Sequence, residues 1–357
     1  MAHCNGQMGG GEQVKNNKEL PYIVQCGKCT GVIIHKHYVM TAGHCLRNST
    51  VYEKDGTFAT YKKVTIAAGD YYLTLDEDKL AAHRSETRKF FDSDELIPHP
   101  KYANNMKSPK YDLGLLYFKE ALFEDGNEHI NSIQMVTAGH RWSFPDPNVY
   151  FKHLRTVDKP YEQSIHDGDY RVNGKLRSLW TTSLPVDHYK SRTGAWVEYV
   201  PPYGSICWMI GLGFQGQKKN GKNKDGKIKY LVKRSTHIKT RDRVRIQSYE
   251  RCNTYSEFDR DRSFCFGRGL NHGGQTYGGD SGGPVICKNP SEKEYKLYGI
   301  MSRSNLEDKT DAVRLAHPEL NHWVNGEIQK QRNQNNADNG EIQKQRNQNN
   351  AGNCNVM

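Results

Sequence analysis

Short hydrophobic runs, rich in β-branched and aromatic residues, are separated along this chain by segments of Gly, Asn, Asp and Pro. Their length and the turn residues between them are typical of antiparallel strands, and argue against a regular alternation of strands and helices. We therefore predict an all-β sandwich or barrel protein. The predicted strands lie in YIVQ, GVIIHKHYVM, KKVTIAAG, DLGLLYF, CWMIGLG, KYLVKR, GPVIC and KLYGIMS.

One clear helix candidate, HPELNHWVNGEIQKQ, lies near the end of the chain. Its apolar residues Leu320, Trp323, Val324 and Ile328 recur three or four positions apart, which predicts a helix that caps the end of the folded part. From Asn325 the polar unit NGEIQKQRNQNNA occurs twice. Two such units cannot bury a core, so we expect a frayed helix or a disordered tail there.

Two regions differ in composition from the predicted strands around them. Residues 137–202 are aromatic-rich, contain proline and are weakly periodic, which indicates a structured surface insertion. Gln217–Arg234 is rich in lysine and is either a patch that binds polyanions weakly or a solvated loop leading into a strand. Its lysine-dense part has no interleaved aromatic residues to stack on bases, so we predict no specific nucleic-acid binding.

Cysteine content points to an oxidising compartment. The chain has 357 residues, nine of them Cys, and a formal net charge of +11. Nine cysteines are compatible with a secreted protein braced by disulfides, and the odd number leaves at least one without an intramolecular partner. Neither the first ten residues nor any later segment has the apolar run of a signal or a membrane span. We expect a secreted protein without a membrane segment, whose signal is not part of this sequence.

A candidate nucleophile, Ser281, lies in QTYGGDSGGPVIC between an acid and two glycines. A serine hydroxyl needs a nearby base, usually a histidine oriented by a buried carboxylate. It also needs N–H donors aimed at the oxygen that becomes negative, and Gly279 allows the backbone turn that presents them. His44 follows an apolar run in YVMTAGHC, and Asp112 opens the run YDLGLLYF. Taken singly, each segment also fits a structural histidine or a turn aspartate.

The segments TAGHC, YDLGLL and GDSGGP together resemble the signature segments of the trypsin/chymotrypsin-like serine endopeptidases, in the same His, Asp, Ser order. Further similar segments extend over residues 21–136 and 203–324. The resemblance implies two antiparallel Greek-key β-barrels with the site between them and a C-terminal helix. It divides the chain into an N-terminal segment, a first barrel, an insertion, a second barrel with the start of the helix, and a polar repeat tail. The bounds are 1–20, 21–136, 137–202, 203–325 and 326–357.

The resemblance also implies a role for each site residue. Ser281 would attack the peptide carbonyl and form an acyl-enzyme, His44 would take and return the proton, and Asp112 would orient His44. The N–H groups of Gly279 and Ser281 would form the oxyanion hole.

The predicted substrate-binding residues are Gln275, Ser302, Arg303 and Ser304. Ser302 resembles the family serine that supports the aspartate and begins the strand on which substrate lies. Gln275 stands six residues before the nucleophile, where trypsin-like members carry an aspartate that recognises Arg or Lys. Because a neutral amide cannot neutralise a buried cation, we expect no preference for basic residues. Arg303 stands where tryptophan is common, and it either favours acidic residues upstream of the cut or points to solvent.

Three disulfides follow from the resemblance. They would join Cys29 to Cys45, Cys207 to Cys287 and Cys252 to Cys265. Tyr277 stands where many members carry a cysteine, so one family disulfide is expected to be absent. The sequence CGKC is alternatively a redox or zinc pair, although no second CxxC occurs. Cys4, Cys26 and Cys354 stay unassigned.

The amino terminus departs from the family. Members are activated by cleavage before an Ile-Val-Gly-Gly segment, whose new amino group pairs with the acid beside the nucleophile, here Asp280. The corresponding stretch NGQMGGGEQVKNNKELPY keeps the glycines but has no Ile-Val and no preceding Arg or Lys.

Besides a third possibility, a secreted polyanion-binding protein for which catalysis is incidental, two functions remain at this stage. The leading hypothesis is a secreted, monomeric serine endopeptidase that acts on proteins or peptides and uses no cofactor or metal. The alternative is a catalytically silent protease homologue that acts as a binding or regulatory protein.

Overall fold

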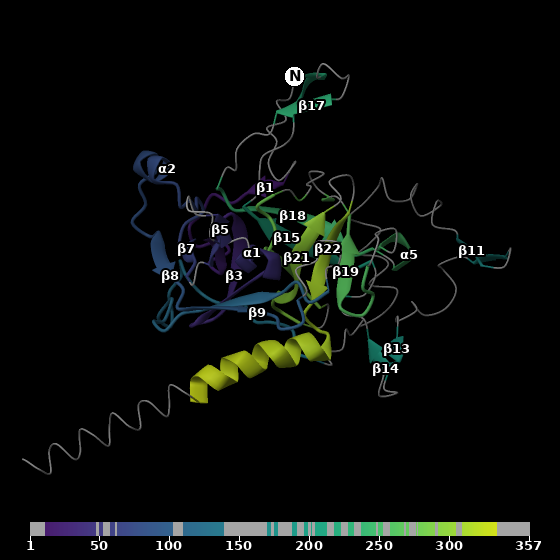
Figure 1. The fold of residues 1–357 in the computed structure, drawn as a ribbon. Coiled ribbons are helices and arrows are strands. Elements are labelled where there is room, and N and C mark those ends of the chain that lie inside the picture. Colours follow the sequence, from purple (N-terminus) through teal and green to yellow (C-terminus); the bar gives the residue numbers. More distant parts are fainter. Residues whose placement is uncertain are drawn as a thin grey trace, which may run out of the picture.

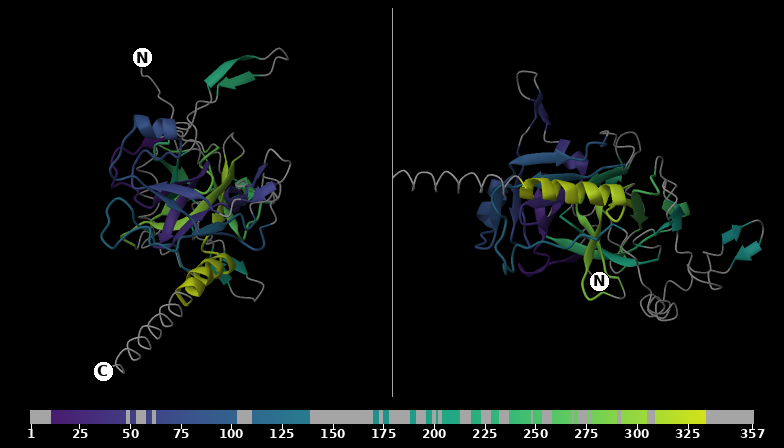
Figure 2. Two further views of the ribbon diagram at one scale, coloured as in Figure 1. Left: turned by 60° about the vertical axis from the view of Figure 1, so that its left-hand side comes forward. Right: turned by 90° about the horizontal axis from the view of Figure 1, so that it is seen from below.

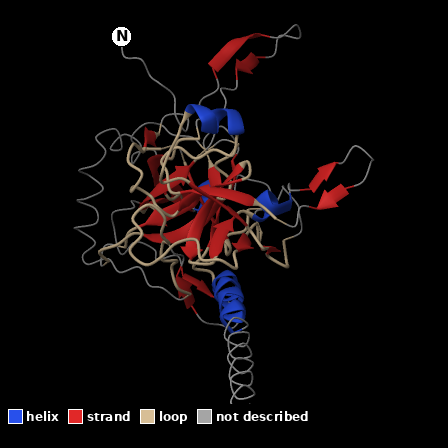
Figure 3. Ribbon diagram, turned by 90° about the vertical axis from the view of Figure 1, so that its left-hand side faces the viewer, coloured by secondary structure: helices blue, strands red, loops and turns tan. Residues whose placement is uncertain are grey.

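Strands fill the centre of the computed structural model and helices lie around them (Figure 1, Figure 3). Most of the predicted insertion and everything after residue 333 lie outside the described part of the chain. The structure describes residues 11–47, 50–52, 58–60, 63–102, 110–138, 170–172, 175–177, 188–190, 196–198, 201, 204–212, 218–222, 228–231, 237–247, 249–252, 258–267, 269–270, 276, 278–289, 292–304 and 309–333.

Two seven-stranded antiparallel sheets form the body of the protein. In spatial order the first sheet contains β8 (Lys89–Asp92), β7 (Thr65–Ala68), β2 (Ile23–Cys26), β3 (Cys29–His35), β4 (Tyr38–Thr41), β10 (Gly114–Tyr117) and β9 (Glu95–Pro98). The second contains β1 (Glu12–Gln13), β18 (Thr240–Arg245), β15 (Ile206–Gly211), β20 (Pro284–Cys287), β21 (Lys296–Ser304), β22 (Thr310–Arg314) and β19 (Ser263–Phe266). β1 precedes every strand of the first sheet along the chain, yet it pairs with β18 of the second sheet.

Smaller elements surround the sheets. Four two-stranded sheets are described: β5 (Thr50–Tyr52) with β6 (Phe58–Thr60), β11 (Tyr170–Val172) with β12 (Lys175–Arg177), β13 (His188–Lys190) with β14 (Trp196–Glu198), and β16 (Lys218–Lys222) with β17 (Ile228–Leu231). The short helices are α1 (Gly43–Arg47), α2 (Glu77–Ala82) and α5 (Tyr249–Cys252). The lysine-rich stretch thus contains the β16–β17 hairpin, but its side chains lie outside those described, so weak polyanion binding stays a prediction.

One hydrophobic cluster extends across both sheets. It joins Val32 and Met40 of the first sheet to Met209 and Ile300 of the second, all of them buried. A second cluster, which includes Val24 and residues of β4, β7 and β10, lies within the first half of the chain. The strands that contribute to both clusters have almost continuous apolar sequences because both of their faces are covered.

The C-terminal helix spans residues 318–333 and is the long yellow helix of Figure 2. Leu320 and Val324 are fully buried, and Trp323 and Ile328 pack against the same cluster, as the spacing of these residues predicts. The predicted all-β fold with two antiparallel units and a C-terminal helix is confirmed. Within the described residues, no helix combines the length and the apolar character that crossing a membrane requires.

Candidate active site

Strand pairing in the first sheet brings His44 and Asp112 together. β4 and β10 are antiparallel neighbours, with Thr41 opposite Gly114. His44 lies in α1 just after β4 ends, and Asp112 lies just before β10 begins. Both side chains therefore leave the sheet at the same end, although they are far apart in sequence.

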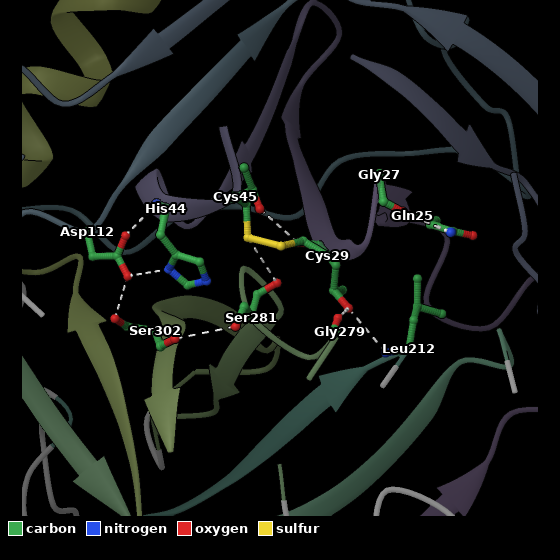
Figure 4. The surroundings of a disulfide bond; sticks show 12 residues. Gln25, Gly27, Cys29, His44, Cys45, Asp112, Leu212, Gly279, Ser281 and Ser302 are labelled. Atoms are coloured by element: carbon green, nitrogen blue, oxygen red, sulfur yellow. Dashed lines mark hydrogen bonds and ion pairs between the residues drawn. A yellow bond between two sulfur atoms is a disulfide. The ribbon is translucent and has the colours of Figure 1, made fainter. Parts of the chain in front are cut away.

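The carboxylate of Asp112 is buried and accepts three hydrogen bonds. Its Oδ1 accepts from the backbone N–H of His44 at 2.8 Å, and its Oδ2 accepts from His44 Nδ1 at 2.8 Å. Ser302 Oγ, from β21 of the second sheet, donates to the same Oδ2 at 2.5 Å (Figure 4). Because carboxylate oxygens accept, Nδ1 carries the proton and the lone pair of Nε2 is available to take another.

The hydroxyl of Ser281 faces Ser302. Its Oγ donates to the carbonyl oxygen of Ser302 at 3.4 Å, and no hydrogen bond joins it to His44 among the described residues. In Figure 4 the imidazole of His44 lies between Asp112 and Ser281. The structure therefore brings all three predicted residues to one place, with the serine hydroxyl turned toward β21.

We use the name nucleophile turn for residues 278–283. Gly279 has a φ of 102° and Gly282 a φ of 83°, which are left-handed conformations that glycine adopts readily. At Gly282 a Cβ atom would also lie 2.0 Å from Thr41 Oγ1, so no other residue fits. The N–H groups of Gly279 and Ser281 have no acceptor among the described residues. They are free to donate to an oxygen in the site.

Asp280, beside the predicted nucleophile Ser281, is buried with 1% of its surface exposed. Its carboxylate lies against the backbone of Gly211 in β15, where a Cβ would be 2.0 Å from Oδ1. Glycine at 211 therefore makes room for this acid. Residues 5–10 of the atypical amino terminus lie outside the described part of the chain, whereas residues 11–22 are described and include β1.

Aromatic rings pack beside Asp112. Tyr111 has a φ of 56°, uncommon for a residue with a side chain, and its carbonyl accepts the N–H of Leu113 at 2.7 Å. The ring of His99 stacks on Tyr111 with centroids 4.7 Å apart and meets Trp323 of the C-terminal helix edge-on. Burial lowers the pKa of His99 to about 4, and its Nδ1 accepts the N–H of Lys101 at 3.2 Å.

Glu319 of the C-terminal helix forms hydrogen bonds and ion pairs with residues of this packing. It accepts from Tyr111 Oη at 3.0 Å and from Arg262 Nη2 at 3.0 Å, and it also pairs with Lys101. Partial burial by itself would raise the pKa of Glu319, but these donors outweigh it and hold the pKa at about 2. Sequence analysis identified neither Glu319 nor His99, because nothing in the local sequence links them to the YDLGLL segment.

All three predicted disulfides are present. Cys29 pairs with Cys45, which ties β3 to α1 beside His44, Cys207 pairs with Cys287, and Cys252 pairs with Cys265. Cys26 is a free thiol, and burial raises its pKa to about 12. Because Cys29 is already bonded, the CGKC sequence is not a redox or zinc pair. Cys4 and Cys354 lie outside the described residues.

The predicted substrate-binding residues are only partly described. Gln275 and Tyr277 lie outside the described residues, but Thr276 between them is buried and its hydroxyl bonds to that of Thr310 on β22. Ser304 Oγ donates to the carbonyl of Lys309 at 3.2 Å.

Arg303 has a partner that sequence analysis did not identify. Its Nε donates to Oδ2 of Asp311 at 2.8 Å, and the Asp311 side chain is fully buried. Burial outweighs the attraction of Arg303 and raises the pKa of Asp311 to about 6. The guanidinium of Arg303 therefore does not simply point to solvent, because it is bound to an acid of the neighbouring strand.

Potential metal ligands have other roles in the described structure. One group, Cys29, His44 and Cys45, brings three ligand atoms within 4.8 Å of one another, but its two sulfur atoms form a disulfide. In the acidic segment near α2, Asp70 Oδ2 accepts from Arg88 Nη2 at 2.9 Å, with both side chains buried.

These features define a two-sheet β protein in which a serine, a histidine and an aspartate converge where the sheets meet. The family model described as Trypsin matches residues 8–149 and 146–324, and the chain therefore belongs to the trypsin family of serine proteases. Chymase from Papio hamadryas is 26% identical over 303 residues, which cover 84% of this chain and 79% of the relative. The predicted family membership is confirmed. Proteases of this family act on proteins, and those with disulfides are typically extracellular.

Proposed function

We propose that this protein is a secreted serine endopeptidase with Ser281 as nucleophile, His44 as general base and Asp112 as the group that orients His44. Ser281 Oγ bonds to the carbonyl carbon of the peptide while His44 Nε2 takes its proton. The C–N bond then breaks, the proton passes to the leaving amine, and an acyl-enzyme remains. Water, deprotonated by the same imidazole, hydrolyses the acyl-enzyme and restores the serine.

The observation that carries the proposal is the environment of the Asp112 carboxylate. Two of its three donors belong to His44 and one to Ser302. A buried carboxylate with this set of donors fixes both the orientation and the tautomer of the imidazole. A purely structural aspartate would need donors, but it would not need them from the histidine that adjoins the nucleophile turn.

The nucleophile turn supplies the second element of the chemistry. The N–H groups of Gly279 and Ser281, which have no acceptor in the described part of the chain, support the proposed oxyanion hole. Donors of this kind stabilise the tetrahedral intermediate, and removal of one typically costs about 10²–10³-fold in rate.

A specific observation favours the alternative of a silent homologue. The Ser281 hydroxyl donates its hydrogen bond to the backbone carbonyl of Ser302 and, among the described residues, not to His44. Catalysis therefore requires a movement of this side chain that brings Oγ within hydrogen-bond reach of His44 Nε2. A homologue that binds without cleaving would keep the hydroxyl where it is.

A fluorophosphonate probe tests the proposal directly, because a phosphorus–Oγ bond forms and fluoride leaves only at an activated serine. We expect the wild type to be labelled and Ser281→Ala to lose labelling, with peptidase activity falling by on the order of 10⁶-fold. Ser93→Ala is the matched control, since the Ser93 hydroxyl is buried, accepts the N–H of Val64 at 2.8 Å and has no proposed role in the site. A folded wild-type chain that is not labelled would refute the enzyme hypothesis and favour the silent homologue.

Probes with different recognition groups test the substrate preference. We propose that uncharged side chains are preferred at the cut, because Gln275 provides no charge for a basic one. Since Asp311 already pairs with Arg303, we infer from Arg303 no preference for acidic substrate residues. Peptide phosphonates with polar or medium-sized apolar groups should react faster than those with Arg or Lys. The reverse order would contradict the proposed preference without affecting the proposed triad.

A further inference from the structure

Thr30, at the start of β3, lies fully buried between the two sheets and contacts both sides of the nucleophile turn. Its Oγ1 donates to the carbonyl oxygen of Gly279 at 2.8 Å. Its backbone N–H donates to the carbonyl oxygen of Ser281 at 3.0 Å. The two bonded carbonyls flank Asp280, so this one residue holds the segment that contains both proposed oxyanion donors.

The Thr30 hydroxyl is itself held in place. It accepts the N–H of Leu212, just after β15 of the second sheet, at 3.1 Å. The carbonyl of Thr30 accepts from Thr41 Oγ1 at 2.9 Å. The neighbouring residue, Cys29, is bonded to Cys45 next to His44. Thr30 is thus anchored to both sheets and to the histidine side of the site.

We propose that Thr30 is a positioning residue for the oxyanion hole. Glycine has more backbone freedom than any other residue, so the peptide planes around Gly279 rotate easily unless an external group holds them. The Thr30 hydroxyl supplies that group, because a bond to the Gly279 carbonyl fixes the plane that continues into Asp280 and Ser281. Misplacement of a catalytic donor by about 1 Å can cost about 10²-fold in rate.

The expected effect of Thr30 on catalysis rests on the proposed function, whereas its expected effect on the order of the nucleophile turn does not. Three variants separate these two effects. Thr30→Val keeps the shape and removes the hydroxyl, and Thr30→Ser restores it. Thr74→Val removes an equally buried hydroxyl, which accepts the backbone N–H of Asp76 at 3.1 Å and belongs neither to the nucleophile turn nor to the contacts that anchor Thr30.

The first measurement is kinetic. We expect Thr30→Val to lose about 10–100-fold in kcat with KM changed less than about threefold, because the hole acts on the transition state. Thr30→Ser should stay within about threefold of the wild type, and Thr74→Val likewise, although Thr74→Val and Thr30→Val should lose similar stability. If Thr74→Val lowers kcat as much as Thr30→Val, the Thr30 hydroxyl has only a structural role and the proposal is overturned.

The second measurement does not need an active enzyme. The N–H of Gly282 bonds to the carbonyl of Met301 at 2.8 Å, and that of Gly283 bonds to the carbonyl of Asp280 at 2.9 Å. Their hydrogen exchange reports the order of the turn. We expect about tenfold faster exchange at both in Thr30→Val and no such change in Thr74→Val. Unchanged exchange in Thr30→Val overturns the proposal, whether or not fluorophosphonate labelling shows that the chain is an enzyme.

Discussion

The two halves of the candidate site are held in different ways. On the histidine side, the Asp112 carboxylate has three donors, two of them from His44, and aromatic rings and Glu319 of the helix pack beside it. On the serine side, the backbone of the nucleophile turn is fixed, but the Ser281 hydroxyl has one hydrogen bond of 3.4 Å, to Ser302. In the proposed mechanism the base is therefore already oriented, whereas the nucleophile still has to move toward it.

This difference shows which part of the chemistry the fold secures in advance. A side chain with three good hydrogen bonds in a buried place is expensive to move. A serine side chain with one long bond changes rotamer at little cost, and substrate that occupies the site can displace it. Changes on the histidine side should consequently act through orientation, and changes on the serine side through the nucleophile itself.

Asp112→Asn should have the largest effect on the histidine side. The amide can donate as well as accept, so it no longer enforces the proton on His44 Nδ1, and Nε2 loses its role as base. We expect kcat to fall by about 10⁴-fold with the fold intact. Stopped-flow or initial-rate assays with circular dichroism as a folding control would measure this. Retention of activity within about tenfold of wild type would show that Asp112 does not orient the base.

Ser302→Ala should have a smaller effect, because it removes one donor of three from Asp112. It leaves both bonds to His44 in place, and it keeps the backbone carbonyl that Ser281 contacts. We expect kcat/KM to fall by about tenfold, the equivalent of one ordinary hydrogen bond. Ser93→Ala, which removes a buried hydroxyl with no proposed role in the site, is the control and should leave kcat/KM unchanged. A loss for Ser302→Ala as large as that for Asp112→Asn would mean that β21 holds the carboxylate alone.

His99→Phe should have the smallest effect, on stability as a function of pH. Because burial holds the pKa of folded His99 at about 4, below its ordinary value of 6.5, the unfolded chain takes up the proton first as pH falls. This linkage lowers stability progressively from about pH 6.5 to pH 4. Phenylalanine keeps the stacking on Tyr111 and removes the titration, so the decrease in Tm between pH 7 and pH 4.5 should shrink by about 2–5 °C. Thermal unfolding followed by circular dichroism would measure this. An identical decrease in both proteins would place the acid sensitivity in other groups.

Sequence patterns predicted the elements of the site better than its surroundings. Residues that must be a particular type, such as Gly279 and Gly282 with their left-handed backbone, are visible locally because few alternatives are sterically allowed. The partners of Arg303 and Tyr111 were not predicted. Asp311 and Glu319 meet them only because β21 pairs with β22 and the helix returns to the first sheet.

The sequence by itself determined the all-β class and the C-terminal helix, and its resemblance to the trypsin-like proteases implied the three disulfide pairs and the candidate serine, histidine and aspartate. The helix follows from periodicity, and the three candidate residues from motifs within short segments. Only the tertiary structure decided that Ser281 bonds to Ser302, that Arg303 is paired, and that Thr30 holds the nucleophile turn. These contacts join residues of the two sheets or of neighbouring strands, and their geometry is set by sheet pairing and core packing, which no local pattern encodes.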